Sequence, residues 1–259
     1  MKKCPLFFAI YFCICLLAAC AASGNGPVPG GTPSNEAQSG GETCQSASVT
    51  AICRVVSNDG SLLLAGMDGD TNIYTLTPED ATNLATGTLV EVTYGGSILE
   101  SWPAQFGGVT AVEAMAGGFD DRCALYFQVL EDLWDVDPGL NSDLTYLGVD
   151  LSQTSLSESE RSAVAWAFAG RHGGELLTGT WEELADQGYI DKEHLQWEDG
   201  ILFTIAEKPV FGSYGLKPVA FDAQKWRSGT GAYFFSSCTA TQAEDGHWGD
   251  YSVGSEAIS

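Results

Sequence analysis

The chain has 259 residues, of which 34 are acidic and 11 are Lys or Arg, and its formal net charge at neutral pH is −23. This balance excludes a protein that binds DNA or RNA through the phosphates, because affinity for phosphates comes mainly from Lys and Arg. With 44% apolar residues the chain can bury sizeable cores, and its length favours two domains.

The first 19 residues have the three parts of a secretory signal: two lysines, a short apolar core and small residues before a cleavage point. The apolar core is shorter than the roughly 20 residues that a membrane-spanning helix needs. The run Leu17-Ala18-Ala19-Cys20 at its end resembles the lipobox of bacterial lipoproteins. That resemblance implies cleavage before Cys20 and attachment of acyl chains such as palmitate to its thiol. An ordinary secretory signal cleaved near Ala22 is the alternative.

Residues 20–47 are dominated by Ser, Gly, Asn, Pro and Thr. They predict a flexible linker, because they cannot bury enough apolar surface to offset the entropy lost on ordering. Cleavage removes no acidic residue, so the folded part should stand away from an anionic membrane surface. We expect a lipid-anchored protein on the extracytoplasmic face of the cell membrane.

Residues 48–116 predict a small β-barrel. Five strand patterns are separated by turn signals such as Asn58-Asp59-Gly60, and a short helix is expected over 78–84, between the third and fourth strands. Five strands with a helix in that place resemble the OB-fold. OB-folds often bind oligonucleotides in basic grooves, but this segment has a single basic residue against eight acidic ones. Nucleic acid is therefore excluded, which leaves a contact with another protein or a role as a spacer.

Residues 98–105 (ILESWPAQ) are similar to a stretch that recurs in uncharacterised surface lipoproteins of Gram-positive bacteria. Together with the lipobox, this stretch makes the chain resemble that group of proteins. The resemblance implies no particular activity.

Residues 119–259 predict an α+β domain, separated from the first domain by a glycine-containing boundary at 116–118. Asp120-Asp121 should cap a helix that runs to about Val136, because apolar residues recur there at helical spacing.

Two capping boxes begin further helices, Ser157-x-x-Glu160 and Thr180-x-x-Glu183. Strand patterns follow over 200–206, 219–227, 232–240 and 247–257. Helices followed by strands indicate helices packed on one face of an antiparallel sheet. The order is similar to cystatin-like and NTF2-like folds.

Four cysteines lie beyond the signal and Cys20, at positions 44, 53, 123 and 238. An exported location permits disulfides, and we favour a Cys123–Cys238 bond between the first helix and a late strand of the second domain. Buried free thiols are the alternative. None of the four forms a C-x-x-C pair, so the sequence predicts no thioredoxin-like site and no zinc knuckle.

Two oxygen-rich stretches invite a comparison with calcium loops. In the first, around Asp68 and Asp70, Ile73 stands where an EF-hand loop needs Gly. The second stretch has Asp135, Asp137, Asn141 and Asp143 around a Pro-Gly bend, and a solvated helix-terminating loop explains it better than calcium does. The sequence predicts no metal and no cofactor.

No catalytic residue is predicted. His172, His194 and His247 lie outside any zinc-binding spacing, and no nucleophile-elbow or phosphate-binding glycine motif occurs. Six of the seven tryptophans lie in the second domain, where exposed rings would form a sugar-binding platform. Aromatic residues at helical and strand spacing are more typical of a core.

The most distinctive stretch is 221–229, in which Lys225 and Arg227 share one face of a predicted strand and Trp226 lies on the other. The two cations predict a ligand-binding pocket for a small anion, unless they only neutralise neighbouring acidic residues. The sequence thus predicts a membrane-anchored binding or spacer module whose partner is a protein or a small anionic ligand. A hydrolase with its site in a cleft of the C-terminal domain is the alternative.

Overall fold

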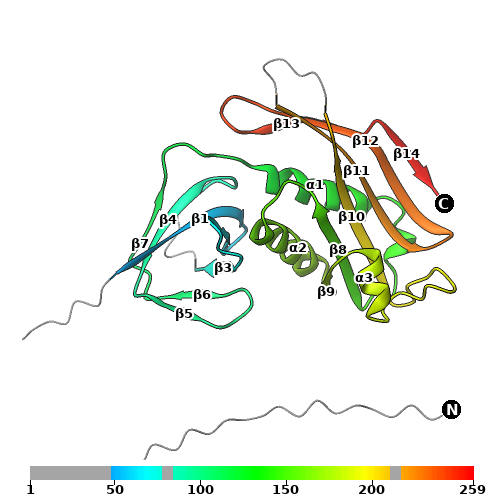
Figure 1. Cartoon of the computed structure of the whole chain (residues 1–259), viewed down its shortest axis with the longest axis horizontal. Helices are drawn as coiled ribbons and strands as arrows, with labels where there is room; N and C mark the ends of the chain where they lie inside the picture. Colours follow the sequence, from blue (N-terminus) through cyan, green and yellow to red (C-terminus); the bar gives the residue numbers. More distant parts are fainter. Residues whose placement is uncertain (1–47, 78–83, 211–216) are drawn as a thin grey trace, which may run out of the picture. The chain divides into compact units, whose positions relative to one another are not determined.

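The structure, a computed structural model, describes residues 48–77, 84–210 and 217–259 (Figure 1). The predicted signal, Cys20, the linker and all but the last residue of the helix expected over 78–84 lie outside these ranges. The described residues belong to one compact unit, Gln45–Ser259, with a mixed α+β fold in which strands predominate. No helix within the described ranges is both long enough and apolar enough to cross a membrane.

The first sheet is antiparallel, with the strand order β3-β2-β1-β4-β7. Its strands are β1 (Val49–Asn58), β2 (Leu62–Gly66), β3 (Ile73–Leu76), β4 (Leu89–Tyr94) and β7 (Ala111–Ala114). The predicted hairpin turn after β1 is confirmed, with Gly60 at φ 86°. The closed barrel is wrong, because in the described part of the chain no pairing joins β3 to β7 and the sheet stays open.

A small hairpin of β5 (Ser97–Leu99) and β6 (Gln105–Gly107) lies beside this sheet. Phe106 is buried and stacks on Tyr74 of β3, with ring centroids 4.1 Å apart. Ile98, Leu99 and Trp102 are exposed on the same hairpin. The hairpin is thus fixed by one aromatic residue and presents three apolar side chains to solvent.

The second sheet has the order β13-β12-β11-β10-β8-β9, and β14 also pairs with β12. Its strands are β8 (Tyr146–Gln153), β9 (Glu175–Thr178), β10 (Gly200–Lys208), β11 (Lys217–Ser228), β12 (Gly231–Gln242), β13 (Trp248–Ser252) and β14 (Ser255–Ile258). The prediction of an antiparallel sheet is wrong at one side, because β8 runs parallel to both β9 and β10. The short strand β9 was not predicted.

Three helices of the described chain accompany this sheet: α1 (Arg122–Asp135), α2 (Glu158–His172) and α3 (Trp181–Asp186), with a short 3-10 turn η2 (Pro138–Asn141) after α1. Both predicted capping boxes are present, and Gly173 ends α2 in a left-handed conformation. The predicted cap of α1 is different. Asp121 makes no side-chain cap and instead accepts hydrogen bonds from the main chain of Trp248 and the ring of His247.

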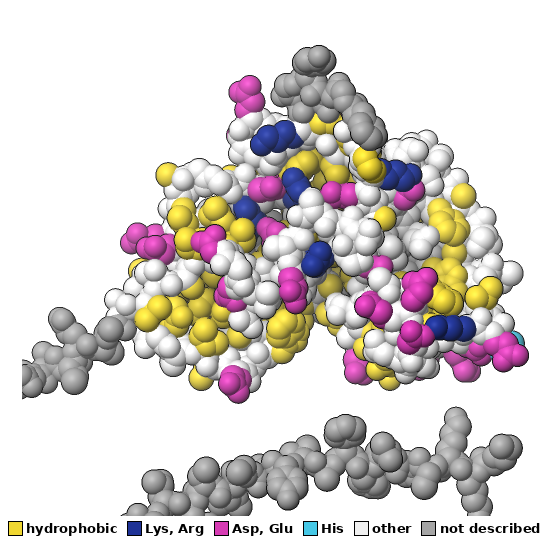
Figure 2. Space-filling model, viewed as in Figure 1, with side chains coloured by type: hydrophobic (Ala, Val, Ile, Leu, Met, Phe, Trp, Pro, Cys, Tyr) yellow, Lys and Arg dark blue, Asp and Glu magenta, His cyan; other side chains and the backbone are white. Residues whose placement is uncertain are grey.

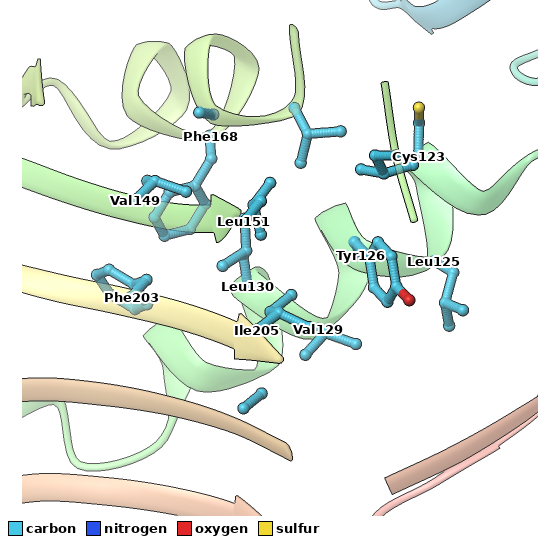
Figure 3. Packing of buried hydrophobic residues seen from close by; sticks show 14 of the residues in the cluster. Cys123, Leu125, Tyr126, Val129, Leu130, Val149, Leu151, Phe168, Phe203 and Ile205 are labelled. Atoms are coloured by element: carbon cyan, nitrogen blue, oxygen red, sulfur yellow. The ribbon is translucent and has the colours of Figure 1, made fainter. Parts of the chain in front are cut away.

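The helices lie on opposite faces of the second sheet. Leu147, Val149 and Leu151 alternate along β8 and pack with the buried sides of α1 and α2. Figure 3 shows Val149 and Leu151 beside Phe168 of α2 and Phe203 of β10 in this cluster. A smaller cluster on the other face joins α3 to Leu202, Trp197 and Trp226. The prediction that helices cover only one face is therefore wrong.

The two sheets meet at α2. Arg54 of β1 is buried, and its Nε donates to Glu160 Oε1 at 2.8 Å, while Nη1 donates to the carbonyl of Gly87. The hydroxyl of Ser159, also buried, donates to the carbonyl of Gly66. Residues of β1, β2 and β3 belong to the same buried cluster as α1 and α2. The domain boundary at 116–118 stays a prediction.

We expect Arg54→Ala to lower the free energy of unfolding by about 3 kcal/mol, because it leaves a largely buried carboxylate without its cation. Lys192→Ala is the control, since its ion pair with Asp186 is at the surface and is worth at most about 1 kcal/mol. Urea unfolding of both variants measures the difference. Equal losses would show that Arg54 does not couple the two sheets.

Candidate functional site

Lys225 lies on the buried face of β11, on the same side as Arg227, as predicted. Its ammonium is not free for a ligand. The Nζ donates to the carbonyls of Trp134 at 3.3 Å, Asp137 at 3.2 Å and Val136, and to Oδ1 of Asn141 at 3.1 Å. These four oxygens surround the three N–H groups of the Lys225 ammonium. The oxygen-rich stretch after α1 therefore binds a lysine side chain.

Arg227 is engaged in the same way. Its Nη1 donates to the carbonyls of Leu140 and Ser142 at 2.9 and 2.6 Å, and Nη2 donates to the carbonyl of Glu198 at 2.7 Å. Trp226 lies on the opposite face of β11, and its ring packs edge to face on that of Trp181, with the ring centroids 5.8 Å apart. The three residues predicted to hold an anion thus make contacts within the fold instead. The loop between α1 and β8 binds both cations, and Trp226 packs with Trp181 of α3 on the other face.

The cysteines of the described chain, Cys53, Cys123 and Cys238, are free and buried. The predicted Cys123–Cys238 bond is not formed in the structure, which has the alternative of buried thiols. Burial raises the pKa of Cys53 to about 12 and that of Cys238 to about 11, so both thiols are protonated at neutral pH.

Each histidine is paired with a carboxylate. His172 contacts Glu131 at 2.9 Å and stacks on Trp134. His194 pairs with Asp191 and His247 with Asp121, both at 2.8 Å. The Asp121 contact raises the pKa of His247. None of these three pairs is part of the groove described next.

A groove of about 580 Å³ runs between the β1–β2 hairpin and the helices α1 and α2. Spacings of three and four residues along each helix bring its lining side chains to one side. The lining residues are Val56, Ser57, Asn58, Asp59, Ser61, Leu63, Thr86, Ala124, Phe127, Gln128, Trp166, Ala167, Gly170 and Arg171. The groove therefore has an apolar floor and a rim of hydroxyl and amide groups, which is the usual composition of a small-molecule site.

Trp166 stands out among the seven tryptophans. Four of the others pair with aromatic or histidine rings, at Trp134, Trp181, Trp197 and Trp226, and Trp248 lies under the guanidinium of Arg122. In the described ranges only Trp102 and Trp166 have no aromatic or cation–π partner. Trp166 is half-buried against the cluster that α1 and α2 form with the second sheet, and it lines the groove. Part of its indole ring is therefore open to a ligand.

The charges at the rim of the groove cancel one another. Arg171 donates to Asp59 in the β1–β2 turn at 3.2 Å and to Glu131 on α1 at 3.4 Å, and its guanidinium lies over the ring of Phe127. Acidic side chains are spread widely over the face shown in Figure 2, with Lys and Arg between them. The groove therefore offers a ligand aromatic, hydroxyl and amide groups without a free cation.

Gly170 is the least expected residue of the lining. It lies in the last turn of α2, where glycine is less favourable than alanine by up to about 1 kcal/mol. Its backbone is outside the left-handed region, and an added Cβ would meet no heavy atom within 4 Å beyond its own helix. Neither the backbone conformation nor the packing at position 170 requires a glycine. The absence of a side chain there leaves more space in the groove.

The groove could not be predicted from the sequence, because its lining comes from four separate segments. Gly170, which follows Ala169 in the last turn of α2, was the one available signal, since a glycine within a helix lowers stability without a local reason. No protein family model, curated protein or solved structure matches this chain.

We expect Lys225→Met to lower the free energy of unfolding by about 3 kcal/mol, since it leaves buried carbonyls without a donor. Lys208→Met is the matched control, because Lys208 pairs with Asp222 at the surface. Chemical unfolding compares the two. A cost for Lys225→Met no larger than for the control would contradict the role given to this ammonium.

The same variant has a pH signature. Burial lowers the pKa of Lys225 from 10.5 to about 8, against the opposing effect of Asp137 and Asp135. Between these two pH values the unfolded chain binds the proton more tightly than the folded protein does, so stability contributed by this group rises with pH. The free energy of unfolding of the wild type relative to Lys225→Met should therefore increase between pH 8 and 10.5 and stay constant below pH 7.

Proposed function

We propose that this protein is an extracytoplasmic lipoprotein, anchored through acyl chains on Cys20, that binds a sugar chain in the groove between the β1–β2 hairpin and the helices. The body would stand on the linker of residues 20–47. The signal, lipobox and linker composition of the sequence support the anchor. The groove supports the binding.

The observation that carries the proposal is Gly170. Alanine would fit at this position in the last turn of α2 and would favour the helix, yet the residue is glycine. The space that it leaves belongs to the groove that is also lined by Trp166. A ligand that needs this space explains both features. A spacer would need neither.

The chemistry of the lining favours a sugar over other ligands. The C–H faces of a sugar ring pack on aromatic rings, and its hydroxyls exchange hydrogen bonds with amides and hydroxyls such as those of Asn58, Gln128 and Ser61. The Asp59–Arg171 pair leaves no unbalanced charge to select an ion. An uncharged ligand with a flat apolar face and many hydroxyls fits these groups.

Binding is favoured over the alternative of a hydrolase. The histidine and carboxylate pairs lie outside the groove lining, and the thiols of Cys53 and Cys238 are buried with raised pKa values. Hydrolysis needs a nucleophile or a general base within reach of a bound ligand. Among the described residues the groove lining contains no histidine or cysteine, and its one carboxylate, Asp59, is paired with Arg171.

Two variants at Gly170 test the proposal. Gly170→Ala should raise the free energy of unfolding by about 0.5–1 kcal/mol through the helix. Gly170→Leu should weaken binding by about tenfold or more, because the longer side chain fills the space for the ligand. Calorimetric titration with neutral tetrasaccharides built from glucose, galactose, mannose or N-acetylglucosamine measures affinity.

Gly249→Leu is the matched control, because Gly249 on β13 is equally open and lies outside the groove. It should bind as the wild type does. Absence of binding to every sugar by the wild type, or equal affinities for Gly170→Leu and the wild type, would overturn the proposal.

Anchoring is tested separately. Cys20→Ala removes the thiol that would carry lipid, so metabolic fatty-acid labelling of the protein should vanish and the precursor should stay uncleaved. Fatty-acid label that persists in this variant would contradict the anchor and leave the groove proposal unaffected.

A further inference from the structure

The parallel strands β8 and β9 are neighbours whose connections leave toward opposite faces of the sheet. The chain passes from β8 through α2 to β9, and from β9 through α3 to β10 on the far side of β8. Helix α2 packs on one face of the sheet, in the cluster around Phe168 and Phe203. Helix α3 packs on the other face, in the cluster around Trp197 and Leu202. In sheets with parallel strands, a crevice outside the carboxyl ends opens at such a switch in direction and commonly binds a ligand.

A cavity lies at this place. It has a volume of about 190 Å³ and is lined by the end of β8, the end of β9 and the first half of α2. It shares no lining residue with the sugar groove, which uses the second half of α2. The cavity is small enough to favour a ligand of about the size of one amino acid.

Two opposite charges line the cavity without pairing. Asp150 is 8% exposed, its Oδ1 accepts a hydrogen bond from the main-chain N–H of Ser152, and its Oδ2 has no partner among the described residues. The guanidinium of Arg161 makes neither a hydrogen bond nor an ion pair within the described chain. The other arginines, at positions 54, 122, 171 and 227, all have partners.

Asp150 is nearly buried, but its Oδ2 is not one of the enclosed side-chain atoms that lack a partner, so solvent reaches this oxygen and a ligand could replace the water there. Asp150 and Arg161 line one small cavity but do not come within 4 Å of each other in an ion pair. A ligand that carries both charges would satisfy both side chains at once. Glu158, also in the lining, makes the cavity net negative and disfavours a simple anion.

We propose that this crevice binds a free α-amino acid, with its ammonium group on Asp150 and its carboxylate on Arg161. The guanidinium suits a carboxylate because it can donate two parallel hydrogen bonds. The site is independent of the sugar groove, so either proposal stands if the other fails. It gives the protein a second ligand, a small zwitterion, at the opposite end of α2.

Calorimetric titration of the protein with glycine, alanine and serine tests the site, with methylamine and acetate as single-charge controls. At least one amino acid should bind, and neither control should bind comparably. Asp150→Asn keeps the acceptor for Ser152, and Arg161→Gln disturbs no existing contact; each should weaken binding by roughly 10- to 100-fold.

Lys192→Gln is the matched control, since Lys192 is a surface cation that lines neither this cavity nor the sugar groove. It should bind the amino acid as the wild type does, and circular dichroism should show that all three variants are folded. The proposal is overturned if no amino acid binds the wild type, if acetate or methylamine binds as well as the amino acid, or if Arg161→Gln retains full affinity.

Discussion

Lys225 places a positive charge under the C-terminal end of α1, where the last carbonyls of a helix have no partner inside the helix. Its Nζ binds the carbonyls of Trp134, Val136 and Asp137, and Asn141 completes the set. One side chain of β11 thereby fixes the end of a helix and the loop that follows it. The position of α1 over the sheet depends on this contact, and α1 is one wall of the groove.

The N-terminal sheet is held by a second buried cation in the same manner. Arg54 binds Glu160, whose other carboxylate oxygen closes the capping box at the start of α2. The helix N-terminus and the β1 strand are therefore fixed by one residue. Because β1 and β2 form the other wall of the groove, these two buried cations set its shape from opposite sides.

Local chemistry made part of the fold predictable. The capping boxes, the turn at Gly60 and the alternation that puts Lys225 and Arg227 on one strand face all depend on residues close in the sequence. What Lys225 binds was not predictable, because its partners lie 84 or more residues away in the sequence. Strand β9 was missed for a similar reason: four residues between Gly174 and Gly179 gain strand character only through parallel pairing with β8.

Helix α2 connects the structural and functional features. Its start meets Arg54 and the crevice beside Asp150, and its second half carries Gly170 and Trp166 into the groove. Its buried side meanwhile packs on the main core. A helix held by all of these contacts would be a rigid support at both proposed ligand sites, which would keep the entropy lost on binding small.

The most direct test of the central claim is an NMR titration of the indole N–H signals of the tryptophans with the tightest-binding tetrasaccharide. A sugar in the groove should shift the Trp166 signal, assigned with Trp166→Phe, and leave buried Trp197 unchanged. Binding that shifts another tryptophan while the Trp166 signal stays in place would contradict the groove as the sugar site.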